Sequence, residues 1–251
     1  MIAAALAMKR FTLVRILSVS MKTPDPEQLV AQIPLFAALQ PSERRLIGGL
    51  IRVQRYAARS PVVWEGDTGG ALFFILSGYL KAVRQGADGN EVLLSVMGPR
   101  EVMGELSVLD GHPRSATVVA LESVELAVLE REPLLGLVQQ SPSLALGLIA
   151  VLTQRLRNLS KRCEDISLLD IPARLAETLL ALAERHGERT GRDVRIPVKL
   201  SQQDLGNMVG ATRESVNKQL RQWTQDGILR QEEGRVVISD LGALRQYVGP
   251  V

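Results

Sequence analysis

A carboxylate, a guanidinium and a hydroxyl lie close together in the stretch "VMGELSVLDGHPRSATVVA". Glu105 follows Gly104, and Arg114 and Ser115 stand together on a Pro-Arg-Ser turn. A carboxylate can accept a hydrogen bond from a ligand hydroxyl, while a guanidinium offers a planar pair of donors to an anion. Ser115 adds a hydroxyl and a backbone amide, and Gly104 lets the backbone come close to a ligand. We therefore expect this stretch to bind a ligand that carries one anionic group and one hydroxyl.

A second stretch, "SQQDLGNMVGATRESVNKQLRQW", carries the signals of two short helices joined by a tight turn. Ser201, followed three residues later by Asp204, can cap the first helix, and Thr212 can cap the second. Gly206 permits close packing, and Gly210 supplies the turn. The second helix has an apolar face formed by Val216, Leu220 and Trp223. This combination predicts a helix-turn-helix.

The polar face of that second helix has the chemistry needed to contact DNA. Guanidinium, ammonium, amide and carboxylate groups can each bond to base edges in the major groove. We expect base contacts from Arg213, Glu214, Asn217 and Lys218. Contacts to phosphates position a protein without reading sequence. We expect these from Lys199, Ser201, Thr212 and Arg221.

The elements around the first stretch change character along the chain. Residues 26–51 have a helical pattern, with Ser42 near the cap of one helix. From Val53 to about Leu129, short apolar runs alternate with turn signals, and Asp88-Gly89 predicts a hairpin. Several short strands at this spacing favour a sandwich or a roll.

A long helix is expected over residues 143–169. Apolar side chains recur at steps of three and four, which is typical of a heptad seam; they are Ile149, Leu152, Leu156, Leu159, Cys163 and Ile166. The seam favours a parallel dimer over packing on the helix's own domain, because basic residues keep its flanks in solvent; these are Arg155, Arg157, Lys161 and Arg162. Cys163 is interpreted as a small apolar seam residue.

Beyond this helix we expect a second domain. Gly187 to Gly191 has the composition of a loop. The residues after it predict helix, turn, helix, hairpin and short helix, with Val236 to Ile238 as the second strand of a wing after the Glu233-Gly234 turn.

Composition narrows the possible classes of protein. The chain has 251 residues and a formal net charge of +3, which permits nucleic-acid binding without requiring it. One cysteine excludes an internal disulfide framework and a cysteine-ligated metal site within one chain. We expect a cytoplasmic protein without a membrane span. Residues 1–25 are interpreted as a disordered extension or as a misassigned start, with translation from Met1 or from Met21.

Four segments resemble the cyclic-AMP receptor protein and fumarate–nitrate regulator family: "IPLFAALQPSE", "GDTGGALFFILSG", "GELSVLDGHPRSATV" and "ATRESVNKQLRQW". The resemblance implies an α+β fold with an N-terminal double-stranded β-roll over residues 26–142. It also implies a dimerisation helix over residues 143–169 and a winged helix-turn-helix over residues 170–251. The expected function is that of a homodimeric transcription regulator controlled by an effector, not of an enzyme.

The opening stretch resembles the phosphate-binding cassette of cyclic-nucleotide domains. The resemblance implies that Gly104, Leu106, Arg114 and Ser115 surround the phosphate and that Glu105 accepts the ribose 2′-hydroxyl. An ungapped count gives Leu159 and Ser160 the positions where cyclic-AMP-responsive members carry a threonine-serine pair for adenine. Because Leu159 cannot donate a hydrogen bond, the effector stays open: cyclic AMP, cyclic GMP, a cyclic dinucleotide, another effector or none.

The resemblance further implies a palindromic double-stranded DNA site with TGTGA-like half-sites, and RNA polymerase as a partner if the protein is an activator. Effector would favour a dimer that places its reading helices about 34 Å apart, one turn of DNA. Two other classes remain as alternatives, an enzyme and a regulatory module without DNA binding. A haem site is disfavoured because His112 is the only histidine in the region expected to form the roll.

Overall fold

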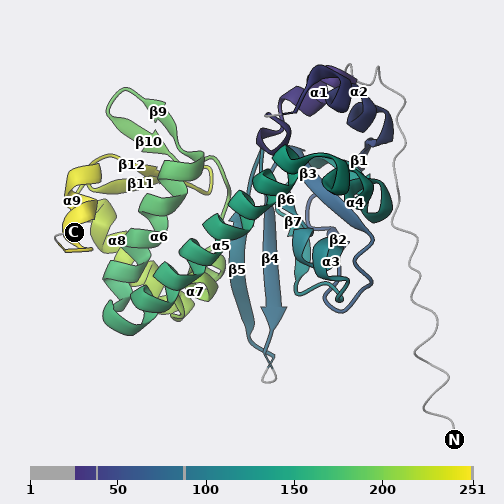
Figure 1. Cartoon of the computed structure of the whole chain (residues 1–251). Helices are drawn as coiled ribbons and strands as arrows, with labels where there is room; N and C mark the ends of the chain where they lie inside the picture. Colours follow the sequence, from purple (N-terminus) through teal and green to yellow (C-terminus); the bar gives the residue numbers. More distant parts are fainter. Residues whose placement is uncertain (1–25, 38, 87–88, 250–251) are drawn as a thin grey trace, which may run out of the picture.

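The computed structural model describes residues 26–37, 39–86 and 89–249. The expected N-terminal extension, Asp88 and the last two residues lie outside this range. Figure 1 shows two units, one built mainly of sheet and one mainly of helix, with the long helix α5 running between them. The predicted α+β class is confirmed.

The N-terminal unit contains two four-stranded antiparallel sheets, with strand orders β1-β8-β3-β6 and β2-β7-β4-β5. The eight strands are β1 (Arg52–Tyr56), β2 (Pro61–Val63), β3 (Ala71–Ser77), β4 (Leu80–Gln85), β5 (Glu91–Met97), β6 (Val102–Met103), β7 (Thr117–Ala120) and β8 (Val124–Glu130). Strands β4 and β5 form the expected hairpin. Apart from this hairpin, consecutive strands alternate between the two sheets, so the arrangement is the predicted roll.

The run "ALFFIL" forms a strand that is buried on both faces, which is why its apolar residues are consecutive. Ala71, Phe73 and Ile75 point into the core between the two sheets. Leu72 and Phe74 point the other way, into a core shared with the helices. Those helices are α1 (Pro26–Ala31), the 3-10 turn η1 (Pro34–Phe36), α2 (Pro41–Leu50) and α4 (Arg131–Gln140).

The start of α2 differs by two residues from the sequence prediction. Gln40, not Ser42, is the cap, and its backbone N–H donates to Glu43 at 2.7 Å. Pro41 occupies the first helical position, where a missing N–H costs nothing. The cap must therefore precede the proline.

Helix α5 spans Pro142–Leu168, one residue earlier than predicted. Its first turns are anchored because Leu144 and Leu148 are buried in the core shared by the roll and its helices. No single helix in the described part of the chain is long and apolar enough to cross a membrane; α4 and α5, bent by 115°, pass together on length and composition alone.

The C-terminal unit combines helices α6 (Ile171–His186), α7 (Gln202–Val209), α8 (Arg213–Gln225) and α9 (Leu241–Gln246) with a small sheet. Its strands are β9 (Glu188–Thr190), β10 (Asp193–Arg195), β11 (Leu229–Glu232) and β12 (Arg235–Ile238), in the order β11-β12-β10-β9. Strands β11 and β12 form the predicted wing, with Glu233 and Gly234 in its turn.

The predicted loop at Gly187–Gly191 is wrong in its centre, since Glu188–Thr190 pair with β10. All three residues of this edge strand are exposed. An edge strand with no buried face needs no apolar alternation, so the pattern gave no strand signal.

The two units share a hydrophobic core. Val83, Leu93 and Val96 from β4 and β5 pack in one cluster with residues of the C-terminal unit, among them Leu205 and Val209 of α7. The roll therefore packs directly against the helix-turn-helix in addition to being joined to it by α5.

Candidate effector pocket and nucleic-acid interface

A pocket of about 460 Å³, counted with its open mouth, lies against the inner face of the roll beside α5. One wall carries the cassette residues Gly104, Glu105, Leu106, Arg114 and Ser115. The apolar part of the lining is formed by Val63, Ala82, Met97, Met103, Ala116 and Val118. The structure thus brings together five of the seven residues predicted for the effector.

Gly104 follows β6 and caps the start of the short helix α3 (Glu105–Asp110). Its φ of 86° lies in the left-handed region, where residues with a Cβ are strained. A Cβ there would also come within 2.3 Å of Arg114 Nη1 and 3.1 Å of the Ala71 carbonyl oxygen. The sharp turn and the close packing both require glycine, as the sequence predicted.

Glu105 is only 1 % exposed although it is an acid. Arg155 Nη1 forms an ion pair with its Oε1 at 2.6 Å, and neither carboxylate oxygen has a hydrogen-bond partner of good geometry in another described residue. Burial raises the pKa of Glu105, and the charge of Arg155 opposes that rise. A ligand hydroxyl would supply the missing donor to this carboxylate.

Arg114 is buried, and its guanidinium is bonded within the protein. Nη2 donates to the Ala71 carbonyl at 2.7 Å, while Nη1 donates to the Gly104 carbonyl and to Ser107 Oγ, each at 3.0 Å. Burial lowers its pKa. The fork expected to face an anion therefore serves protein acceptors in this arrangement, and an anion would have to compete with them. Ser115 is exposed beside it.

Leu159 and Ser160 do not line this pocket within one chain; both are exposed on α5. The residue of α5 that lines the pocket is Arg155, which also donates to the Val102 carbonyl. Sequence analysis placed Arg155 among the solvated flanks and missed this role. The available signal was the position of Arg155, one helical turn before Leu159, together with the need of a buried carboxylate for a cation.

The prediction that the basic residues beside the α5 seam lie in solvent also needs correction at Lys161 and Arg162. Lys161 pairs with Glu177 of α6. Arg162 donates to the backbone carbonyls of Leu93, Leu94 and Met208. Three of the four basic residues thus contact their own chain, and only Arg157 keeps the expected exposed position without such a contact among the described residues.

The helix-turn-helix has the caps predicted from sequence. Ser201 Oγ accepts from the Asp204 amide at 3.0 Å, and Asp204 Oδ2 accepts from the Ser201 amide at 3.0 Å. Thr212 Oγ1 accepts from the Ser215 amide at 3.2 Å. Gly210 has a φ of 66°, as a left-handed helix end requires.

Helix α8 has one buried and one exposed face, again as predicted. Val216, Leu220 and Trp223 are fully buried. The exposed positions are those of Arg213, Glu214, Lys218 and Arg221; Lys199, Ser201 and Thr212 are exposed nearby. Asn217 differs, because it is half-buried and its Oδ1 accepts from Gln202 Nε2 at 3.2 Å. Its expected base contact would require that bond to break.

Two family models match the two units. The cyclic nucleotide-binding domain matches residues 53–141, and the Crp-like helix-turn-helix domain matches residues 173–247. The CRP-like cAMP-activated global transcriptional regulator of Mycobacterium tuberculosis is 33% identical over 214 residues, which cover 85% of this chain and 96% of the relative. This chain belongs to the CRP family.

A second curated relative supports the same assignment, and two solved structures are similar in fold. The cyclic AMP receptor protein of Thermus thermophilus is 32% identical, over 85% of this chain and 95% of the relative. The fold is that of FixK2 from Bradyrhizobium japonicum, with a TM-score of 0.71, 18% identity and coverage of 80% and 98%. The c-di-GMP responsive regulator CLP of Xanthomonas campestris has a TM-score of 0.64, 25% identity and coverage of 76% and 94%.

The protein is therefore a DNA-binding transcription regulator with a cyclic nucleotide-binding domain. Its relatives are regulators and not enzymes, which removes the enzyme alternative. The helix-turn-helix removes the other alternative, a regulatory module without DNA binding.

Proposed function

We propose that this regulator acts as a homodimer that binds a cyclic mononucleotide in the roll and, in response, a palindromic DNA site with TGTGA-like half-sites. The observation that carries the effector proposal is Glu105. This carboxylate lines the pocket, is almost completely buried and accepts no hydrogen bond among the described residues. A ribose 2′-hydroxyl is a donor of the right kind, and the adjoining Arg114 and Ser115 suit a phosphate.

Cyclic AMP is the first candidate, because two relatives above 30% identity are named for it. Ser160 and Leu159 would approach the base from α5 of either protomer, and Leu159 would contribute only apolar contact. A cyclic dinucleotide is the second candidate, since the similar regulator CLP is described as responsive to c-di-GMP.

The dimer proposal is supported by the exposed seam of α5. Ile149, Leu156, Leu159 and Ile166 are each more than half exposed in a single chain. A second copy of the same helix would remove them from water, and burying each leucine contributes about 1.5–3 kcal/mol. We propose that the β-roll spans residues 26–142, the dimerisation helix residues 143–169 and the winged helix-turn-helix residues 170–251. We also propose a cytoplasmic location and, if the protein activates transcription, contact with RNA polymerase.

For DNA, we propose that Arg213, Glu214, Asn217 and Lys218 contact bases, and that Lys199, Ser201, Thr212 and Arg221 contact phosphates. The exposed polar face of α8 and the capped helix ends support this assignment. Each well-formed base contact would contribute about 1–3 kcal/mol of discrimination.

The test has two titrations. Calorimetry with cyclic AMP, cyclic GMP and c-di-GMP identifies the effector, and fluorescence anisotropy with a labelled palindromic duplex measures DNA affinity with and without each compound. By linkage, the true effector tightens DNA binding by the same factor by which DNA tightens effector binding. Unchanged DNA affinity with all three compounds would refute the cyclic-nucleotide proposal and leave DNA binding standing.

A further inference from the structure

Asn217 differs from the other three residues of α8 proposed to contact bases, because it is half-buried and bonded to the preceding helix. Its Oδ1 accepts a hydrogen bond at 3.2 Å from Nε2 of Gln202, the first residue of α7. Asn217 follows Arg213 by four residues, so the two lie on the same face of α8. The bond therefore ties a proposed base contact to the start of the other helix of the motif.

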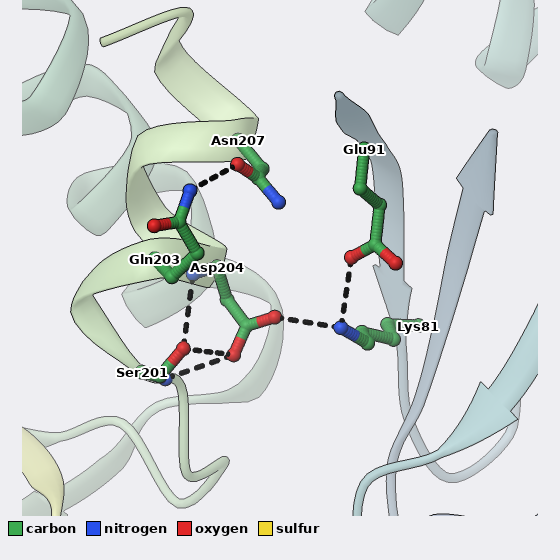
Figure 2. A network of polar contacts seen from close by, with 6 residues as sticks. All are labelled: Lys81, Glu91, Ser201, Gln203, Asp204 and Asn207. Carbon is green, nitrogen blue, oxygen red and sulfur yellow. Dashed lines mark hydrogen bonds and ion pairs between the residues drawn. The ribbon is translucent and has the colours of Figure 1, made fainter. Parts of the chain in front are cut away.

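The start of α7, from which Gln202 projects, is held in place by its neighbours. Ser201 and Asp204 cap the helix reciprocally, and Lys81 of the roll donates to the other oxygen of the Asp204 carboxylate at 2.8 Å (Figure 2). Figure 2 also shows that the next residue, Gln203, bonds within its own helix, to the side chain four positions further on, at 2.8 Å. Of these two adjacent glutamines, Gln202 is thus the one that reaches α8.

The bond to Gln202 decides which end of the Asn217 amide is left for DNA. An asparagine amide has an acceptor end, the carbonyl oxygen, and a donor end, the NH2 group. Contact with adenine through both ends needs the oxygen as well, and this is the contact that the bond to Gln202 opposes. The partial positive charge at the start of α7 also favours the oxygen on that side. The donor end is what remains for a base.

A lone donor distinguishes the bases of the major groove by one feature. Guanine and thymine present carbonyl oxygens there, O6 and O4, whereas cytosine and adenine present amino groups, N4 and N6. An NH2 group can donate to a carbonyl oxygen but has nothing to accept from an amino group. Held in this orientation, Asn217 favours guanine or thymine over cytosine or adenine at the base that it reaches.

We propose that Gln202 is a positioning residue for DNA recognition: it holds the Asn217 amide with its NH2 group toward the major groove, and it thereby sets a preference for guanine or thymine at one base of each half-site. This inference rests on the proposed function, because it assigns a role within the same DNA-reading surface. Gln202 contacts no base in this assignment and acts only through Asn217.

The test replaces Gln202 with glutamate. A carboxylate can only accept, so the Asn217 amide should turn to donate to it and present its oxygen to the groove. The base preference should then reverse, from guanine or thymine to cytosine or adenine. Gln203→Glu is the matched control, because it places the same charge on the adjacent residue, whose side chain bonds within α7. Both variants should fold, since a carboxylate in the first turn of a helix is favourable.

The wild type first selects its site from a pool of random duplexes, with and without cyclic AMP, so the test does not assume the TGTGA sequence. Fluorescence anisotropy then measures the affinity of each protein for that duplex and for its symmetric single-base variants. At one position, the affinity ratio of guanine or thymine over cytosine or adenine should fall about fivefold or more in Q202E relative to Q203E. Repulsion of phosphates by the new charge affects every sequence alike, so it cancels in this ratio.

Equal ratios in Q202E and Q203E at every position would overturn the proposal. A wild-type preference for cytosine or adenine at the position that changes would overturn it too. The double variant Q202E/N217A separates positioning from direct contact: its base preferences should match those of Asn217→Ala alone, and an effect of Q202E that persists without Asn217 would refute the assigned role. A selected site without TGTGA-like half-sites, or binding that ignores cyclic AMP, would count against the proposed function and not against this inference, because the ratios can be measured on any selected site.

Discussion

At the scale of single residues, the proposed effector site centres on the contact between Glu105 and Arg155. The carboxylate is buried with its pKa raised, so the protein keeps a costly group that an apolar side chain could replace. Such a group is expected where a ligand supplies its missing hydrogen bonds. The cation that pairs directly with this group is Arg155 of α5, while the charge of Arg114 in the cassette acts on it more weakly.

Glu105→Gln should weaken cyclic AMP binding by about 1–2 kcal/mol, roughly five- to thirtyfold, because a charge-assisted hydrogen bond becomes a neutral one. Calorimetry measures the change. Folding should not suffer, since the substitution removes a buried charge and leaves Arg155 partly solvated. Glu65→Gln is the control, because Glu65 is exposed and pairs with Arg84 away from the pocket. Equal affinities of the two variants would contradict a hydroxyl contact at Glu105.

Arg213→Ala should relax discrimination at one base pair of each half-site by about 1–3 kcal/mol, because its fork suits the acceptor pair of guanine. Binding to a panel of single-base variants of the duplex measures this. A loss that is the same for every sequence, together with a smaller salt dependence, would instead assign Arg213 to a phosphate.

Local features at this scale could be predicted from sequence, and distant ones could not. Hydrogen bonds and backbone angles within a few residues determine the roles of Gly104, Ser201, Thr212 and Gly210. These roles can therefore be predicted from the local sequence. Arg155 had only a weak local signal, its place one turn before Leu159, because its partner lies fifty residues earlier in the chain and only the packing of α5 on the roll brings the two together.

At the scale of elements, α5 combines an exposed apolar seam with basic residues beside that seam. The sequence prediction placed those basic residues in solvent. The seam itself is exposed as expected. Its flanks instead hold the rest of the chain, through Arg155 to the pocket, Lys161 to α6 and Arg162 to β5 and α7. Long basic side chains are ambiguous in this way, because the same residue types suit both water and buried acceptors.

Leu156→Lys should convert the proposed dimer into monomers, because two-fold symmetry places the buried charge at the interface twice. The loss should exceed about 3 kcal/mol, the value of two buried leucines at the low end. Sedimentation or scattering at micromolar concentration measures it. Gln154→Lys adds the same charge at an exposed position off the seam and should remain dimeric. A dimeric L156K would contradict the seam.

At the scale of the whole molecule, the packing of the roll against the helix-turn-helix could not be predicted from the sequence. Val83, Leu93 and Val96 are ordinary strand residues in the pattern, and nothing in their spacing indicates that they pack with α7. The pattern indicates which residues are buried but not against which partner.

The ion pair between Lys81 of β4 and Asp204 of α7 should make the stability of the folded chain depend on pH in acid. Asp204 has a pKa below its usual value in the folded chain, so its contribution to the free energy of unfolding is complete above about pH 4, the unfolded value. That contribution is lost as the pH falls through the lower folded value. Glu105, whose pKa is raised, has the opposite sign.

Comparing the Asp204→Asn variant with the wild type isolates the contribution of Asp204 to the pH dependence of stability, because Glu105 is the same in both proteins. Denaturant unfolding of both proteins should give a stability difference that is largest near neutral pH and shrinks below about pH 4. A difference that is constant across this range would contradict a charged Lys81–Asp204 pair.

Arg162 finds its three partners in main-chain oxygens rather than in side chains. Mutational drift at positions 93, 94 and 208 leaves those oxygens in place, so exchange of any of these residues for another that preserves the local backbone retains the attachment. Among these contacts, the attachment of α5 to β5 and α7 is then sensitive to a change at one codon, the one for Arg162 itself.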